Sequence, residues 1–183
     1  MSDAPQVRKH NSGPHVEDWG TPQDLYERLD DMFQFDLDPC ASGREIAKAP
    51  HFFTPEDDGL QQKWFGNVFM NPPWGSGQPI RHWLTKAGQE LDKGHCDTVV
   101  ALLPASVGTN WFNDLVMPYA YRIWFVRGRL AFEDYTQASK HRGKKKANFD
   151  SVIVEMTYPE PQRLASGLCL PRRPVVSTWR QDE

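Results

Sequence analysis

An apolar run stops abruptly at two prolines in the stretch Asn67-Val68-Phe69-Met70-Asn71-Pro72-Pro73-Trp74. The run predicts a short strand over residues 67–70, because such side chains suit a covered sheet. Proline cannot donate a hydrogen bond to a neighbouring strand, so the strand must end before Pro72. Asn71 is therefore expected at the carboxyl end of a strand, where ligands bind in open α/β sheets.

The sequence on either side alternates between strand-like and helix-like patterns. A short extended element is expected at residues 51–53, and helical periodicity covers residues 79–91 and 111–117. Alternation of apolar and polar residues predicts a strand at 34–37, and mainly apolar runs predict strands at 67–70, 98–103, 121–126 and 151–156. This alternation predicts an α/β domain with a mostly parallel sheet, whose last two strands pair antiparallel because no helix separates them. The segment between those two strands is expected to be poor in sheet.

A further helix is predicted to open at Thr21-Pro22, with Thr21 as N-cap and Pro22 at the first helical position. Spacings of four and three place Leu25, Leu29 and Met32 on one apolar face. Trp64 is expected to cover an edge of the core.

The 183 residues predict one compact domain, with a tail at 1–18, the domain at 19–158 and a Pro/Arg-rich arm at 159–183. The apolar runs are too short to cross a membrane, and no signal peptide is apparent, so a cytoplasmic location is expected. Three cysteines without a C-x-x-C pair and six histidines without an H-x-x-x-H spacing favour neither a disulfide framework nor a metal site.

Charge is distributed unevenly around a net value of −3. Residues 120–146 carry eight basic and two acidic side chains, whereas residues 1–64 are acidic overall. A basic stretch on an acidic body fits local contact with a polyanion, and equally fits a solvated loop. For a nucleic-acid ligand, the expected phosphate contacts are Arg127, Arg129, Lys140, Arg142, Lys144, Lys145 and Lys146.

The motif Asn71-Pro72-Pro73-Trp74 suits chemistry on an exocyclic amino group. Such a nitrogen is a poor nucleophile because its lone pair is delocalised into the ring, and two acceptors on its hydrogens favour the pyramidal form. The Asn71 side-chain carbonyl and the Pro72 peptide carbonyl supply two acceptors, while Trp74 offers a stacking face. The alternative is a proline-terminated strand followed by a core tryptophan.

A second polar turn, Asp38-Pro39-Cys40-Ala41-Ser42-Gly43, follows another predicted strand. Its small residues let a ligand approach the backbone, and Asp38 could accept hydrogen bonds from an ammonium or hydroxyl group. The 33 residues from Asp38 to Asn71 allow a crossover that makes the two strands neighbours. Cys40 fits a packed thiol better than a nucleophile. The alternative is an ordinary turn.

Together these motifs resemble one family, the phage-type DNA N6-adenine methyltransferases, often called the Dam family. The resemblance extends from Trp19 to Met156. It runs through Trp19-x-Thr21-Pro22, residues 35–42, Asp58-Gly59-Leu60 with Trp64, residues 71–74, Leu103-Pro104 and Gly128-Arg129-Leu130-x-Phe132.

The resemblance implies a Rossmann-like class I fold that binds S-adenosyl-L-methionine and methylates adenine N6 in duplex DNA through a flipped base. It implies cofactor contacts from Asp38, Pro39, Ala41 and the adjoining Cys40. Thr21-Pro22, with Trp19 in the same motif, would lie near the methionyl carboxylate and Asp58 near the adenosine. It implies that residues 71–74 surround the target base.

Two other classes of function remain open from the sequence. The same fold also methylates RNA adenine or protein glutamine, since both present a planar amino group, although the basic stretch favours nucleic acid. A DNA-binding protein without catalytic activity would keep the fold but bind no cofactor.

Overall fold

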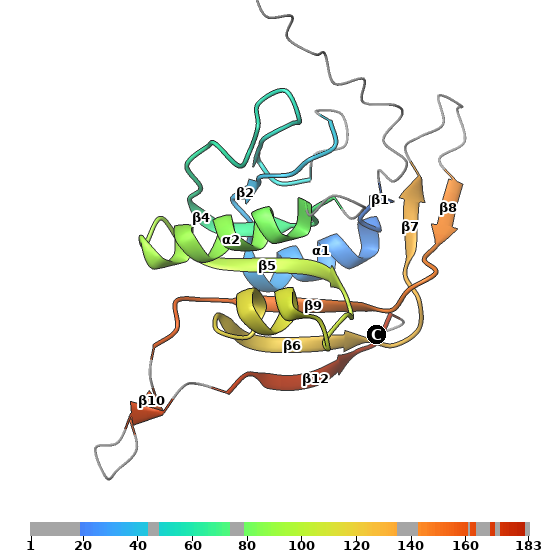
Figure 1. The fold of residues 1–183 in the computed structure, drawn as a ribbon. Helices are drawn as coiled ribbons and strands as arrows, with labels where there is room; N and C mark the ends of the chain where they lie inside the picture. Colours follow the sequence, from blue (N-terminus) through green and yellow to red (C-terminus); the bar gives the residue numbers. More distant parts are fainter. Residues whose placement is uncertain are drawn as a thin grey trace, which may run out of the picture.

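The structure is a computed structural model that describes residues 19–43, 48–73, 79–134, 143–160, 162–163, 169–170 and 173–181. Seven strands form the main sheet in the order β12-β6-β9-β5-β4-β2-β3 (Figure 1). They are β2 (Leu37–Asp38), β3 (His51–Phe52), β4 (Gly66–Met70), β5 (Cys96–Pro104), β6 (Ala120–Val126), β9 (Ser151–Met156) and β12 (Val175–Trp179).

The strand directions place the carboxyl ends of most of these strands at one edge. Strand β9 runs antiparallel to both its neighbours, β5 and β6, and the other neighbouring pairs are parallel. The predicted mixed α/β fold is therefore confirmed, including the antiparallel pairing of residues 121–126 with 151–156. Strands β2, β4, β5, β6 and β12 all end at the edge where ligands bind in such sheets.

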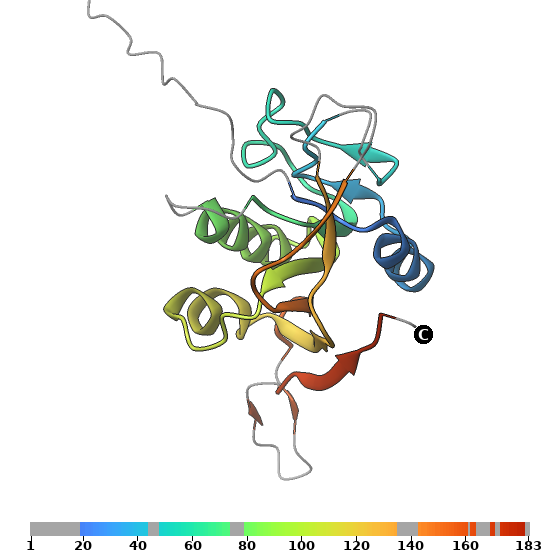
Figure 2. The ribbon, with the colours of Figure 1, turned by 90° about the vertical axis from the view of Figure 1, so that its right-hand side faces the viewer.

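Helices cover the two faces of the sheet. Helix α1 (Gln23–Phe33) lies on one face, and α2 (Pro79–Asp92) lies on the other with the π-helical turn η1 (Phe112–Val116) (Figure 2). Val99, Ala101 and Leu103 of β5 pack on the α2 side, whereas Val100 and Leu102 pack on the α1 side. Burial on both faces explains why this strand reads as a continuous apolar run.

The basic segment contains a hairpin, which corrects the prediction that it is poor in sheet. Strand β7 (Ala131–Asp134) pairs antiparallel with β8 (Gly143–Lys146) and, on its other side, with β1 (Trp19–Gly20). Lysine-rich β8 lacks the apolar alternation by which strands are predicted from sequence. Strands β10 (Gln162–Arg163) and β11 (Cys169–Leu170) form a separate pair.

Two predictions about the core were wrong in detail. Met32 is 51% exposed, and Tyr26 is buried with Leu25 and Leu29 instead, because α1 turns its Tyr26 side toward Phe35 and Phe69. Trp64 is fully buried rather than at an edge, since it stacks on Trp83 in the core between the sheet and α2.

No helix in the described ranges is long and apolar enough to span a membrane.

Candidate functional site

The two predicted strand tips meet at the carboxyl edge of the sheet. Strands β2 and β4 are parallel neighbours, with Leu37 paired to Val68, which confirms the adjacency expected from the spacing. Asp38 ends β2, and Asn71 directly follows β4. The backbone of Asn71 donates a hydrogen bond to the Cys40 sulfur, so the turn after β2 contacts the residue after β4.

Asp38 is a buried carboxylate at the floor of this site. Its Oδ1 accepts a hydrogen bond from the Cys40 backbone amide at 3.1 Å. Burial raises the pKa of Asp38 to about 7, and the hydrogen bonds from Cys40 and the charge of Lys48 offset this only in part. A cationic group placed beside Asp38 would stabilise its ionised form.

Cys40 has the character of a packed thiol. Burial, and then the nearby Asp38 carboxylate, raise the pKa of Cys40 well above its ordinary value. A neutral thiol is a weak nucleophile. Across the described ranges, no group of three or more His, Cys, Asp and Glu side chains is placed to hold a metal ion.

Thr21 supports Asn71 instead of capping α1. The N-cap is Pro22, with extended backbone angles (φ −54°, ψ 135°) and no side-chain capping bond, so the predicted cap at Thr21 was wrong. Thr21 is buried, and its Oγ1 accepts a hydrogen bond from Asn71 Nδ2 at 3.1 Å. This bond engages the nitrogen of the Asn71 amide and thereby orients its carbonyl oxygen.

The predicted Asp58-Gly59-Leu60 turn packs against the turn after β2. The Trp64 indole holds it in place, because Nε1 donates to the Gly59 carbonyl at 2.9 Å. A Cβ atom on Gly59 would lie only 1.9 Å from the Pro39 carbonyl oxygen. Asp58 is exposed and has a positive φ of 50°. The two turns therefore lie in direct backbone contact.

For the remaining candidate residues the structure gives burial or backbone pairing, and one of them lies outside the described residues. Pro72 is buried and Pro73 is exposed, while Trp74 lies outside the described residues. Ala41 and Pro39 are buried in the turn after β2. Trp19 lies on β1, so its backbone pairs with the hairpin strand β7.

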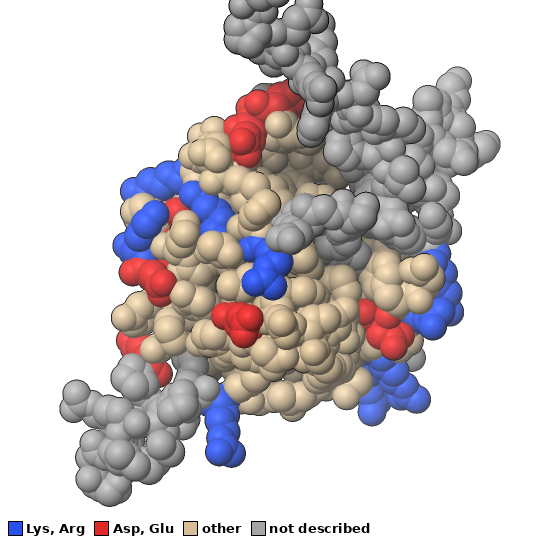
Figure 3. All heavy atoms as spheres, in the orientation of Figure 1, with Lys and Arg blue, Asp and Glu red and all other residues tan. Residues whose placement is uncertain are grey.

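The basic candidates are divided between the end of β6 and the hairpin. Arg127, Arg129 and Lys146 are exposed, and Arg129 Nε lies 3.7 Å from an Asp150 carboxylate oxygen. Lys144 and Lys145 lie on β8, and Lys140 and Arg142 are outside the described residues. On the face shown in Figure 3, the described Lys and Arg residues lie in separate groups, several at the edges and one near the middle, rather than in one patch.

Two residues near the site were not predicted from the sequence. The positive charge of Lys48 lowers the pKa of Asp38. The Tyr26 hydroxyl is buried without a hydrogen-bond partner among the described residues. Burial, then the charges of Asp30 and Asp38, raise the pKa of Tyr26. Tyr26 lies three positions before Leu29 on the helix, so the periodicity itself contains the signal for its burial.

The mixed α/β sheet with helices on both faces has the Rossmann-like architecture of a methyltransferase domain. The chain belongs to the family described as DNA N-6-adenine-methyltransferase (Dam), whose model matches residues 9–171.

Two phage proteins named DNA N-6-adenine-methyltransferase are similar to this chain. That of Haemophilus phage HP1 is 32% identical over 117 residues, which are 62% of this chain and 65% of the relative. That of Escherichia phage T1 is 28% identical over 162 residues, or 79% of this chain and 66% of the relative. The matches thus span just under two thirds of each relative's length. The crystal structure of a proposed RNA methyltransferase from Pyrococcus horikoshii matches over 58% of this chain and 50% of that one, at 18% identity and a TM-score of 0.40.

Proposed function

We propose that this protein transfers a methyl group from S-adenosylmethionine to the exocyclic N6 of adenine in DNA. The observation that supports it most is the contact between the two strand tips, which sets the buried Asp38 beside Asn71. Membership of the adenine-methyltransferase family supports the choice of adenine and of DNA.

The residues around Asp38 fit the amino-acid end of this cofactor. Asp38 has a raised pKa because its burial is only partly compensated, and an ammonium group would compensate it. The N-terminus of α1 has no side-chain cap, so its backbone N–H groups suit a carboxylate. When bound, S-adenosylmethionine supplies an electrophilic methyl group. The Asp58-Gly59 turn, packed on Pro39, is the expected wall beside the adenosine.

Asn71 and Pro72 prepare the amino group of the target base. The Asn71 side-chain oxygen, oriented through Thr21, accepts one hydrogen of the amine, and the Pro72 carbonyl accepts the other. These two bonds favour the pyramidal amine, whose lone pair then faces the methyl donor. Transfer would form the nitrogen–methyl bond as the sulfur–methyl bond breaks, with S-adenosylhomocysteine as the leaving group. The extra proton on the nitrogen would then pass to water, so no side chain has to ionise the amine beforehand.

A duplex base must leave the stack to reach these acceptors, at a cost of a few kcal/mol. Trp74 is the proposed stacking surface for the flipped base. Exposed Arg127, Arg129 and Lys146 lie at or near the carboxyl edge of the sheet and are the proposed phosphate contacts, together with the other basic residues of the hairpin.

The proposal is tested by a competition between substrates. The protein is incubated with methyl-tritiated S-adenosylmethionine and equal amounts of unmethylated duplex DNA, single-stranded DNA and RNA of the same sequence. We expect label in adenine of the DNA. Label confined to RNA, to cytosine or to protein would show that the acceptor is wrong.

The bond between Thr21 and Asn71 predicts a specific kinetic effect. Thr21→Val keeps the shape of the side chain but removes its hydroxyl, so the Asn71 amide loses the acceptor that orients it. We expect kcat to fall about tenfold, the worth of one hydrogen bond, while Thr21→Ser retains the rate. Single-turnover rates and cofactor Kd are measured for both variants. A weaker Kd at unchanged kcat would place the hydroxyl on the cofactor instead.

Asp38 predicts that cofactor binding depends on pH. Below pH 7 the free protein holds Asp38 protonated, whereas the complex requires the carboxylate, so binding releases a proton. The Kd for S-adenosylmethionine should tighten about tenfold per pH unit from pH 5.5 to 7 and then level off. Calorimetry over this range tests it, with Asp38→Asn as the variant that loses the dependence. Equal Kd values at pH 5.5 and 7.5 for the unaltered protein would contradict the assigned role.

A further inference from the structure

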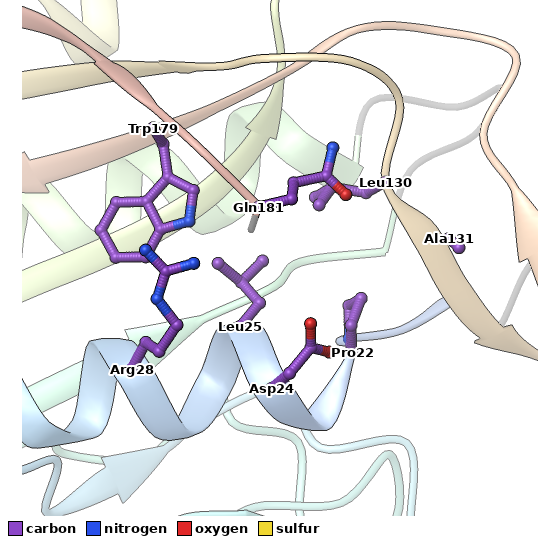
Figure 4. Close-up of a pocket in the computed structure, with 8 residues that line it drawn as sticks. All are labelled: Pro22, Asp24, Leu25, Arg28, Leu130, Ala131, Trp179 and Gln181. Atoms are coloured by element: carbon purple, nitrogen blue, oxygen red, sulfur yellow. The ribbon is translucent and has the colours of Figure 1, made fainter. Parts of the chain in front are cut away.

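A cavity of about 110 Å³ lies between the N-terminal turn of α1 and the end of β12. Figure 4 shows Asp24, Leu25 and Arg28 on the helix side, with Trp179 and Gln181 opposite and Leu130 closing one end. Because β12 and β4 end at the same edge of the sheet, this cavity lies at the edge that carries Asn71. Pro22 lines it, and the preceding residue, Thr21, bonds Asn71.

Trp179, which lines the cavity, carries a buried donor that has no partner in the described part of the chain. Trp179 is 6% exposed, and its Nε1 makes no hydrogen bond within the described part of the chain. Figure 4 shows this nitrogen on the side of the indole that faces Leu25 and Gln181. A buried donor without a partner is unfavourable, so an acceptor that bonds to Trp179 Nε1 would be stabilised there.

The indole is also held in position. The Arg28 guanidinium lies 4.5 Å from the centroid of the Trp179 ring, and its Nη1 donates to the Arg180 carbonyl at 2.8 Å. Trp124 packs edge-on to the same ring, with centroids 6.0 Å apart. The donor direction is therefore fixed before any ligand binds, as recognition sites require.

The lining favours a neutral planar ligand over an anion. Arg28 and Asp24 balance in charge, so a phosphate would face an opposing carboxylate. Gln181 Nε2 donates to the Arg127 carbonyl at 2.8 Å, and Figure 4 shows its oxygen on the side of Leu130, as an acceptor. One donor, Trp179 Nε1, and one acceptor, the Gln181 side-chain oxygen, thus lie among the apolar residues Leu25, Leu130 and Pro22. A nucleobase matches these groups, because it has apolar faces and an edge of donors and acceptors.

We propose that this cavity binds one unpaired nucleobase of the DNA beside the target adenine and so contributes to sequence preference. The inference rests on the proposed function for the choice of DNA. The base places a carbonyl oxygen or ring nitrogen on Trp179 Nε1, with its ring between Leu25 and Leu130.

The test observes the indole directly. The Trp179 Nε1–H signal in a ¹H–¹⁵N spectrum of the full chain is assigned with Trp179→Phe, and the protein is titrated with the four deoxynucleosides, inorganic phosphate and single-stranded DNA. We expect a downfield shift with DNA and with at least one nucleoside, and none with phosphate. If the Trp179 Nε1–H signal shifts with none of the nucleosides and not with DNA, the proposal is overturned. A shift that phosphate causes and the nucleosides do not cause also overturns it.

The DNA affinity of variants provides a second test that does not depend on the NMR spectrum. Trp179→Phe and Ala131→Leu, which narrows the cavity, should each weaken DNA binding about tenfold. Trp111→Phe, beside η1 on the opposite face of the sheet, should not. Unchanged DNA affinity in both cavity variants contradicts the proposal. Methyl transfer and cofactor binding are measured on the same samples. Methyl transfer without a shift of the indole signal would reject the base-binding role of the cavity alone. A shift without methyl transfer would support that role but reject the proposed function.

Discussion

Asn71→Ala is expected to lower the rate of adenine methylation by a hundred- to a thousandfold. The substitution removes one of the two acceptors that hold the target amine in its reactive form, and losing one such preorganised hydrogen bond costs on the order of 10²–10³ in rate. Single-turnover kinetics with labelled cofactor measures the effect.

Cofactor affinity distinguishes a loss of methylation rate at Asn71 from a general loss of the folded site. The Asp38 turn should keep its cofactor contacts in Asn71→Ala, so Kd should change by less than about threefold. Asn113→Ala is the matched control, because Asn113 is exposed and bonds only to the neighbouring Val107 and Thr109 carbonyls among the contacts described. If Asn71→Ala keeps more than a tenth of the normal rate, Asn71 is not the acceptor.

Gly59→Ala is expected to destabilise the protein and to weaken cofactor binding together. Its Cβ would lie 1.9 Å from the Pro39 carbonyl oxygen and 3.2 Å from Trp83, so backbone must move. Overpacking of this kind costs about 1–3 kcal/mol, which corresponds to a Tm lower by roughly 2–12 °C for a chain of this length. Thermal unfolding and calorimetry measure both effects.

Gly108→Ala provides the matched control for this substitution. Nothing lies within 4 Å of a Cβ at Gly108, and its φ is not positive, so neither stability nor binding should change. A Gly59→Ala protein as stable as Gly108→Ala would show that the two turns are not in the close contact described.

The sequence predicted most of the sheet because its central strands carry strong local patterns. Residues 151–156 were predicted with the bounds of β9, and the continuous apolar run at 98–103 lies within β5. Burial on both faces selects such runs, so their signal is readable without knowledge of neighbours. The adjacency of Asp38 and Asn71 followed from strand direction and crossover length.

What could not be predicted depends on contacts between distant residues. The Thr21 hydroxyl can cap its own helix or bond Asn71, fifty positions away, and only the folded chain decides between them. Strand β12 has four exposed residues, Val175 to Thr178, because it lies at the sheet edge, where none of the described helices covers them, so no alternation marks it. The cavity beside Trp179 joins α1 to the last strand, and no local pattern links them.

The most direct measurement identifies the methylated atom. Duplex DNA is incubated with the protein and S-adenosylmethionine carrying a deuterated methyl group, digested to nucleosides and analysed by mass spectrometry, with Asn71→Ala in parallel. We predict deuterated N6-methyldeoxyadenosine with the unaltered protein and almost none with the variant. Deuterium found only in methylcytosine, or in equal amounts of methyladenine with both proteins, would contradict an amino group held between Asn71 and Pro72.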